Sequence, residues 1–311
     1  MRKVVSFFSL LILTVGLYAE GELSGKFALA EGDTVVFAQG ILQFNPARNI
    51  WRFAEHQWDT LTQAENALLA ADYDGYIDLF AWGTSGYNNQ WPYSNTTYSG
   101  ETDISGTNYD WGVFNTITNG GNKAGEWRTL TSAEWNVLFS RGQEGPATVQ
   151  GIYGCVLLPD NWSGMPEGLP EFVTKPLTID EYQTANVYDA EQWNTMEKAG
   201  AVFMPSMRYW TASVASVTDQ PTPPWLMATY AAYFIPAPLY VGTGGSYMTA
   251  TARTSRYAVR LTKQYVPEDN TPTGIDNTSA GMQTQKTIHN GQLLLARPDG
   301  SVYNIIGVKI K

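Results

Sequence analysis

Aromatic side chains supply most of the binding chemistry that this sequence offers. The 311 residues include eleven Trp and eighteen Tyr. Trp225, Tyr240 and Tyr247 lie in Pro- and Gly-rich stretches between runs typical of strands. Aromatic faces in such connections can bind a sugar ring or a partner's side chain through apolar area, while their polar edges stay hydrated. We therefore treat these three as candidate ligand-binding residues; the alternative is that they only pin long loops to the core.

Acidic residues offer two further chemistries. Asp72, Asp74 and Asp78 have the alternating spacing with which a calcium loop begins, but a third acidic position and the bidentate Glu at the twelfth are missing. Turn-forming Asp residues explain this spacing better. Glu101 and Asp103 could serve as the carboxylate pair of a glycoside hydrolase, although turn-rich loops often contain such pairs. We predict no metal site and no catalytic residue.

Cysteine and histidine are scarce. Cys155 is the only cysteine and stands in the apolar run I-Y-G-C-V-L-L-P, which favours a small buried residue over a reactive thiol. His56 and His289 are the only histidines, so a Ser-His-Asp or His-rich metal site has almost no material. We expect no cofactor.

The N-terminus has the layout of a secretory signal peptide. Arg2 and Lys3 precede an apolar run that ends at Leu17, and a small residue, Ala19, follows. The run is shorter than the roughly 20 residues of a membrane span. We predict a signal peptide at 1–19 and a secreted or cell-surface protein without a transmembrane span. The net charge of −10 indicates that nucleic acid is not a partner.

These candidates need a scaffold, and its centre is the run W-R-T-L-T-S-A-E-W-N-V-L-F at 127–139. Thr131 can cap a helix while Glu134 reaches back to the N–H of the cap residue, which is the capping-box pattern. The helix should therefore begin near Ser132. Its apolar face, which we expect to be buried against a sheet, carries Trp135, Leu138 and Phe139.

The other elements follow from turn signals and periodicity. Apolar stretches between Phe27 and Phe44 flank Glu31-Gly32-Asp33, which predicts a hairpin. Further strands are predicted at 50–54, 151–158, 201–204, 208–212, 227–235 and 257–262, with helices at 60–71 and 190–199. Capping boxes are predicted for the pairs Thr178 with Glu181 and Asp189 with Gln192, and Gly200 can end the helix at 190–199.

The segment 73–125 is rich in Gly, Asn, Ser, Thr and aromatic residues and has few signals of regular structure. Because it contains Trp82, Trp91 and Trp111, we expect an ordered, loop-rich layer that its aromatic residues hold against the core. A polar linker is predicted at 267–274. It separates a domain at 20–266 from a β tail at 275–311, in which 291–295 and 301–310 form a hairpin around a D-G turn.

Several stretches resemble a known family. They are W-R-T-L-T-S-A-E-W from Trp127, V-L-L-P-D-N-W from Val156, R-Y-W-T-A-S from Arg208, A-T-Y-A-A-Y-F from Ala228 and R-Y-A-V-R-L from Arg256. Together they resemble the Fibrobacter succinogenes major paralogous domain, which has a C-type lectin-like fold. The resemblance implies an α+β fold with short helices, twisted antiparallel strands and long loops. Independently of this resemblance, we expect Arg208, Arg256 and Arg260 to be internal partners of loop carboxylates and not ligand contacts.

The resemblance also limits the function. The Glu-Pro-Asn, Gln-Pro-Asp and Trp-Asn-Asp motifs of calcium-dependent lectins are absent, and Asp160-Asn161-Trp162 reverses the last of them. The helix signature is similar to that of formylglycine-generating enzymes, but those work through two cysteines. The terminal run N-G-Q-L-L-L-A-R-P-D-G-S-V-Y-N-I-I-G is similar to sorting tails of the type IX secretion route.

We therefore expect a secreted or cell-surface binding or adhesion protein, non-catalytic, whose ligand is a glycan or a protein. Two alternatives remain at this stage: a structural surface component that self-assembles, and a glycoside hydrolase that uses loop carboxylates.

Overall fold

The structure, a computed structural model, describes most of the chain. The described residues are 21–31, 33–94, 96–174, 184–215, 228–234, 246–267, 285–289, 292–296, 301–304 and 309–310. For 228–234, 246–249, 285–289, 292–296 and 304 the description covers the backbone alone. The predicted signal peptide and the predicted capping box of Thr178 and Glu181 lie outside these residues.

The chain divides into two compact units, Met1–Tyr265 and Val266–Lys311. The first unit is α+β, as predicted, with mainly antiparallel sheets and short helices. One four-stranded sheet has the order β1-β2-β13-β5, with the strands Phe27–Ala30, Asp33–Phe37, Leu261–Gln264 and Arg128–Thr129. The other has the order β8-β6-β7-β9, with the strands Val187–Tyr188, Glu144–Val149, Ile152–Leu157 and Val202–Pro205.

Two smaller sheets and the helices complete this unit. The hairpin of β3 and β4 comprises Leu42–Asn45 and Ile50–Phe53. The three-stranded antiparallel sheet β10-β11-β12 comprises Arg208–Val214, Ala228–Phe234 and Ser246–Ala252. The α-helices are α1 (Gln63–Asn66), α2 (Trp111–Phe114), α3 (Ser132–Ser140) and α5 (Ala190–Lys198), and η1 (Tyr87–Asn89) is a 3₁₀ turn.

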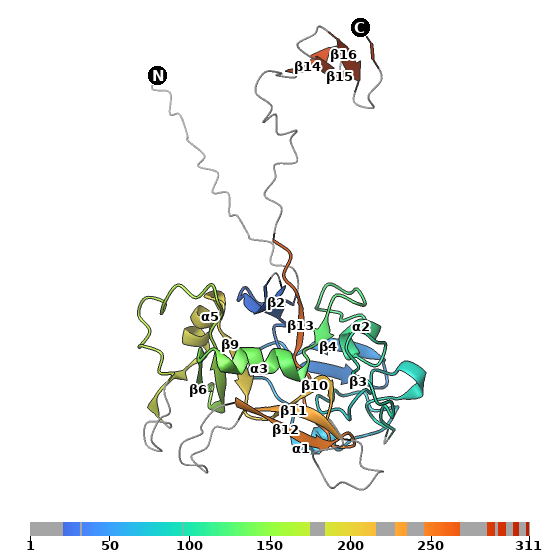
Figure 1. The fold of residues 1–311 in the computed structure, drawn as a ribbon, viewed down its shortest axis with the longest axis vertical. Helices are drawn as coiled ribbons and strands as arrows, with labels where there is room; N and C mark the ends of the chain where they lie inside the picture. Colours follow the sequence, from blue (N-terminus) through green and yellow to red (C-terminus); the bar gives the residue numbers. More distant parts are fainter. Residues whose placement is uncertain are drawn as a thin grey trace, which may run out of the picture. The chain divides into compact units, whose positions relative to one another are not determined.

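Helix α3 confirms the prediction for the run at 127–139. The Thr131 hydroxyl accepts a hydrogen bond from the Glu134 N–H (3.2 Å), and the Glu134 carboxylate accepts one from the Thr131 N–H (2.7 Å). Trp135 and Leu138 are buried and Phe139 is half-buried. The helix contacts β1, β10, β11 and β12, so it packs on a sheet as expected (Figure 1).

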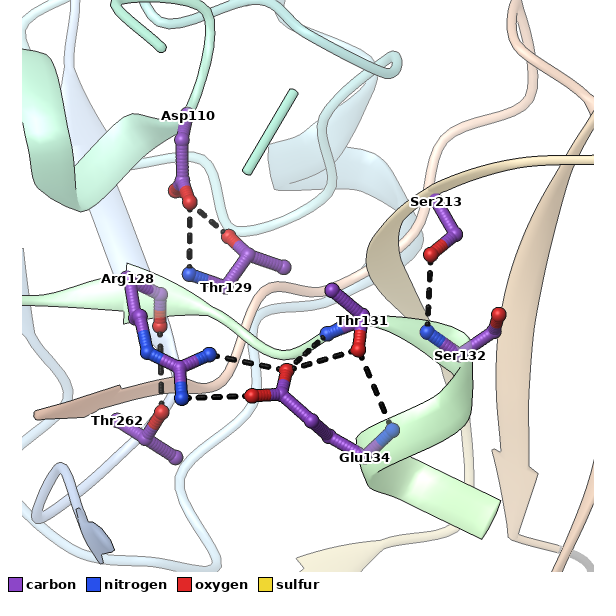
Figure 2. A network of polar contacts seen from close by, with 8 residues as sticks. All are labelled: Asp110, Arg128, Thr129, Thr131, Ser132, Glu134, Ser213 and Thr262. Carbon is purple, nitrogen blue, oxygen red and sulfur yellow. Dashed lines mark hydrogen bonds and ion pairs between the residues drawn. The ribbon is translucent and has the colours of Figure 1, made fainter. Parts of the chain in front are cut away.

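A polar network fixes the start of α3 to its neighbours (Figure 2). Arg128 of β5 pairs with Glu134 (Nη2 to Oε1, 2.7 Å). One residue further on, Thr129 donates two hydrogen bonds to the fully buried carboxylate of Asp110, the residue that caps α2. The Ser132 N–H donates to a hydroxyl on β10. The cap of α2, the short strand β5 and the distant strand β10 are therefore joined at the start of one helix.

The segment 257–261 connects the sheets of the first unit. Tyr257 forms an isolated bridge with Phe80, and Ala258 forms one with Tyr209. The continuous strand β13 begins only at Leu261 and not at 257 as predicted, because the preceding residues pair singly with two different segments.

Three apolar clusters fill the first unit. The first lies under α3 and includes Trp135, Leu138 and Ala258. The second is mainly aromatic and includes Trp82 and Trp111, with the half-buried Trp91 packed against it. This arrangement confirms the packed layer predicted for 73–125. The third cluster contains residues of α5, β6, β7 and β9.

The helix predicted at 60–71 is much shorter than expected. Helix α1 ends at Asn66, and Ala64, Leu68 and Ala71 of the predicted apolar face are exposed. The buried residue is Asn66 instead, whose side-chain oxygen accepts hydrogen bonds from the main-chain N–H groups of Asp78 and Leu79 (both 3.0 Å). These long-range bonds fix the segment and replace an apolar helical face.

In its described residues, the second unit contains a three-stranded antiparallel sheet in the order β14-β15-β16, with the strands Gln285–His289, Gln292–Ala296 and Val302–Asn304. The pairing of β15 with β16 agrees with the predicted tail hairpin, and β14 is an additional strand. The D-G turn at 299–300 lies outside the described residues.

Helix α5 ends where two glycines meet. Gly200 has a φ of +100°, and a Cβ at this position would lie 2.9 Å from Gly25 Cα and 3.0 Å from Pro159 Cγ. A side chain would therefore strain the backbone and separate the helix end from the segment that leads into β1.

We expect Gly200→Ala to lower the free energy of unfolding by about 2–4 kcal/mol. Gly164→Ala is the matched control, since Gly164 has a similar φ of +112° but nothing within 4 Å of the added Cβ. Its expected cost is about 1 kcal/mol. Urea unfolding followed by circular dichroism measures both values, and equal costs would contradict the packing argument.

Candidate functional site

Of the three predicted ligand-binding aromatics, only the backbone of Tyr247 is described. Tyr247 lies within β12, opposite Tyr233 of β11, and not in a connection as predicted, because the residues from Ser246 onward pair with β11 in continuous register. Trp225, Tyr240 and the side chain of Tyr247 lie outside the described part of the chain. The aromatic site therefore stays a prediction.

The Asp residues considered for calcium have other partners. Asp74 pairs with Arg48 at the surface (Oδ2 to Nη2, 2.8 Å). Asp78 is buried, and its carboxylate accepts hydrogen bonds from the Leu61 N–H (2.7 Å) and from Asn66 Nδ2 (2.8 Å). Burial raises the pKa of Asp78 to about 6, against the opposing effect of these hydrogen bonds. Among the described residues, no group of three or more His, Cys, Asp or Glu is placed to hold a metal ion.

The acid pair considered for hydrolysis also has a structural partner. Asp103 accepts hydrogen bonds from Ser213 Oγ (3.1 Å) and from the Val214 N–H (2.8 Å), which ties its loop to β10. Glu101 is exposed. Similarly, Asp160 accepts a hydrogen bond from the Ala28 N–H of β1 (2.6 Å). These carboxylates hold segments together.

Cys155 is buried in β7, as predicted. The expectation of a carboxylate partner is wrong for Arg256, which donates to the main-chain carbonyls of Pro92 (2.5 Å) and Ser94 (3.0 Å). Pro92 and Ser94 lie outside the strands, and the guanidinium supplies hydrogen bonds to their carbonyls.

A surface hollow of about 530 Å³ lies beside the β3–β4 hairpin. Its walls are the hairpin, the loop 55–61 that follows it, and the turn between β6 and β7. The charged and aromatic lining residues are Arg52, Glu55, Trp58 and Asp59. Gln43, Thr60 and Gln150 add neutral polar groups, and Leu61 and Ile152 add apolar ones. We call this feature the hairpin hollow.

The cation of the hairpin hollow is held in place. Arg52 projects from β4 and lies over the ring of Tyr76, with 3.6 Å from the guanidinium carbon to the ring centroid. Its Nε donates to Gln43 Oε1 on the paired strand (3.0 Å). Stacking and hydrogen bonding together restrict the side chain, so its remaining N–H groups have a fixed direction.

The loop 55–61 presents the aromatic and acidic groups. The ring of Trp58 stacks on that of His56, with centroids 4.5 Å apart and planes at 16°. Asp59 Oδ2 accepts a hydrogen bond from the His56 N–H (2.8 Å) and lies 3.0 Å from His56 Nδ1. This side chain to backbone bond closes a tight turn that sets the direction of Trp58.

No family model, curated protein or solved structure matches the chain. None of the helices in the described ranges has the length and apolarity needed to cross a membrane.

Sequence reasoning missed the hairpin hollow. The run E-H-Q-W-D at 55–59 places two acids, an amide, a histidine and a tryptophan between a predicted strand and a predicted helix. That mixture in a short connection was the available signal. The wall formed by Gln150 could not be found in this way, because it comes from a turn distant in sequence.

Proposed function

We propose that this is an exported, non-catalytic binding protein whose hairpin hollow holds a carbohydrate. The carrying observation is that Trp58 lines the same hollow as Arg52, Glu55 and Asp59. A sugar ring has an apolar C–H face and a rim of hydroxyl groups that both donate and accept. A site for it needs an aromatic surface beside hydrogen-bond donors and acceptors, and these residues supply all three.

We also propose that the first unit is a C-type lectin-like domain of the Fibrobacter succinogenes major paralogous type. Support comes from the capped helix α3, its packing on β10, β11 and β12, and the bridges made by 257–261. The hairpin hollow contains two carboxylates, and no group of three or more possible metal ligands is found among the described residues, so we propose that direct contacts bind the sugar.

Replacing Trp58 with alanine tests the proposal. A glycan array probed with the protein lacking 1–19 identifies the ligand, and calorimetry then compares the variants. We expect Trp58→Ala to weaken binding about 30-fold, because the ligand loses its aromatic contact. Trp162→Ala is the matched control, since Trp162 is also half-buried against the third cluster but does not line the hollow.

Two outcomes would contradict the proposal. One is an array without signal from the intact protein. The other is equal binding by Trp58→Ala and Trp162→Ala. An array without signal from a protein that forms large assemblies would favour the alternative of a self-assembling surface component.

Glu55 and Asp59 support a second candidate function, because they place two carboxylates on one hollow. Glycoside hydrolysis requires such a pair on either side of the scissile bond. Prolonged incubation of the bound glycan with the protein, followed by mass spectrometry, would reveal shortened products. Loss of those products in both Glu55→Gln and Asp59→Asn would establish an enzyme in place of a binding protein.

A further inference from the structure

Gln57 is a fully buried residue within the loop 55–61, which forms one wall of the hairpin hollow. Its neighbours Glu55 and Trp58 line the hollow, whereas its own side chain points into the protein. A buried amide offers two acceptor sites and two N–H groups, and all of them must be satisfied for the loop to be stable.

The side chain of Gln57 makes four hydrogen bonds. Its Oε1 accepts from the Phe203 N–H of β9 (2.6 Å) and from Arg260 Nη2 (3.1 Å). Its Nε2 donates to Glu197 Oε2 of α5 (2.8 Å) and to the Ala201 carbonyl (3.3 Å). One amide therefore joins the loop to α5, to β9 and to the segment that leads into β13.

One of the four partners of Gln57, Arg260, carries a buried positive charge. The side chain is 1% exposed, and its Nε and Nη1 have no hydrogen-bond partner among the described residues. Desolvation lowers the pKa of Arg260 to about 10, so the guanidinium is still charged at neutral pH. The attraction of Glu197 opposes that shift, and Gln57 stands between the two groups, bonded to both.

We infer that Gln57 is the positioning residue of the hairpin hollow. Its amide bridges the Arg260 guanidinium and the Glu197 carboxylate by hydrogen bonds, and this bridge fixes the loop 55–61 in its binding geometry. This inference rests on the proposed function. A loop that is fixed before binding loses little conformational entropy when the ligand binds, and the affinity is higher for that reason.

Exchanging the amide of Gln57 and the carboxylate of Glu197 tests this bridge. In Gln57→Glu, the new carboxylate can still accept from Phe203 and Arg260. Its second oxygen faces the Glu197 carboxylate, and more distantly the Ala201 carbonyl, where the wild-type amide donated to both. Repulsion should displace the loop. In the double variant, which adds Glu197→Gln, the new amide on α5 donates to the new carboxylate on the loop, and the total charge is that of the wild type.

Two measurements on the protein lacking 1–19 read out the effect. Hydrogen exchange by mass spectrometry reports the order of the peptide 55–61 without any ligand. Calorimetry reports affinity for the glycan that the array selects. We expect Gln57→Glu to raise exchange in 55–61 about tenfold and to weaken binding about tenfold, and the double variant to restore both to within about threefold of the wild type.

The results separate the inference from the proposed function. If Trp58→Ala weakens binding while Gln57→Glu leaves exchange and affinity as in the wild type, the positioning role is wrong and the binding site stands. If the array gives no signal but exchange in 55–61 rises and is restored by the double variant, Gln57 positions the loop and the carbohydrate proposal is wrong. If the double variant does not restore exchange to near the wild-type rate, the bridging role of Gln57 is wrong.

Discussion

Replacing Trp135 with alanine is expected to lower the free energy of unfolding by about 3–5 kcal/mol. The indole is 1% exposed and lies between Phe37 of β2 and Phe139 of its own helix, with ring centroids 5.9 and 5.6 Å away. Alanine would leave a large cavity under α3, where β10, β11 and β12 also pack. The rigid capping network at the helix start limits how far the surrounding structure can collapse into that space.

Val137→Ala on the same helix is the control. Val137 is 36% exposed, so its replacement should change the free energy of unfolding by less than about 0.5 kcal/mol. Urea unfolding followed by circular dichroism gives both values. A loss below about 1 kcal/mol for Trp135→Ala would show that α3 is not the centre of the first cluster.

Replacing Asp110 with alanine is expected to lower the free energy of unfolding by about 3 kcal/mol. The carboxylate accepts from the N–H and the hydroxyl of Thr129, at 2.9 and 2.8 Å (Figure 2). It also accepts weakly from the Gly112 N–H at 3.4 Å. Alanine leaves these buried donors without an acceptor, at about 1–3 kcal/mol each, while removal of a buried charge offsets part of the loss.

Asp110→Asn should cost only about 1 kcal/mol, because the amide can accept from the Thr129 N–H and donate to the Thr129 hydroxyl. The Asn variant also has no ionisable group at position 110, so comparison with the wild type isolates the titration of Asp110. Burial raises the pKa of Asp110 to about 6 from 3.8, against the hydrogen bonds from Thr129 and Gly112. The folded state therefore binds a proton that the unfolded state releases, and the resulting stability is present below about pH 4 and is lost as pH rises through about 6.

The difference in unfolding free energy between the wild type and Asp110→Asn should accordingly fall as the pH rises from about 4 to about 7. Other carboxyl groups, including the buried Asp78, titrate in both proteins and cancel in the difference. A difference that stays constant or grows with pH would mean that Asp110 is ionised throughout this range in the fold.

Local signals in the sequence were sufficient to predict the helices α3 and α5. Each depends on a hydroxyl or carboxylate three residues before a Glu or Gln, and both capping boxes are present in the structure. The first hairpin and most strands were also predicted, because their apolar runs are bounded by turn residues. These features are decided by neighbours in sequence, which a single chain makes visible.

Features that depend on distant partners were predicted poorly. The helix expected at 60–71 gave way to bonds between Asn66 and the main chain near Asp78, which no periodicity encodes. The hairpin hollow was missed for the same reason, since Gln150 and Trp58 meet only in the fold. A carboxylate partner was predicted for the buried cation Arg260, because the sequence does not indicate that it would donate a hydrogen bond to the amide of Gln57.

The position of Cys155 gives the protein an intrinsic reporter of its own opening. The thiol is 6% exposed within β7, and the chain has no other cysteine. A thiol-specific alkylating reagent can therefore add a single mass increment only when this sheet separates from the first cluster. The rate of that modification measures how often β7 is transiently released, without any engineered label.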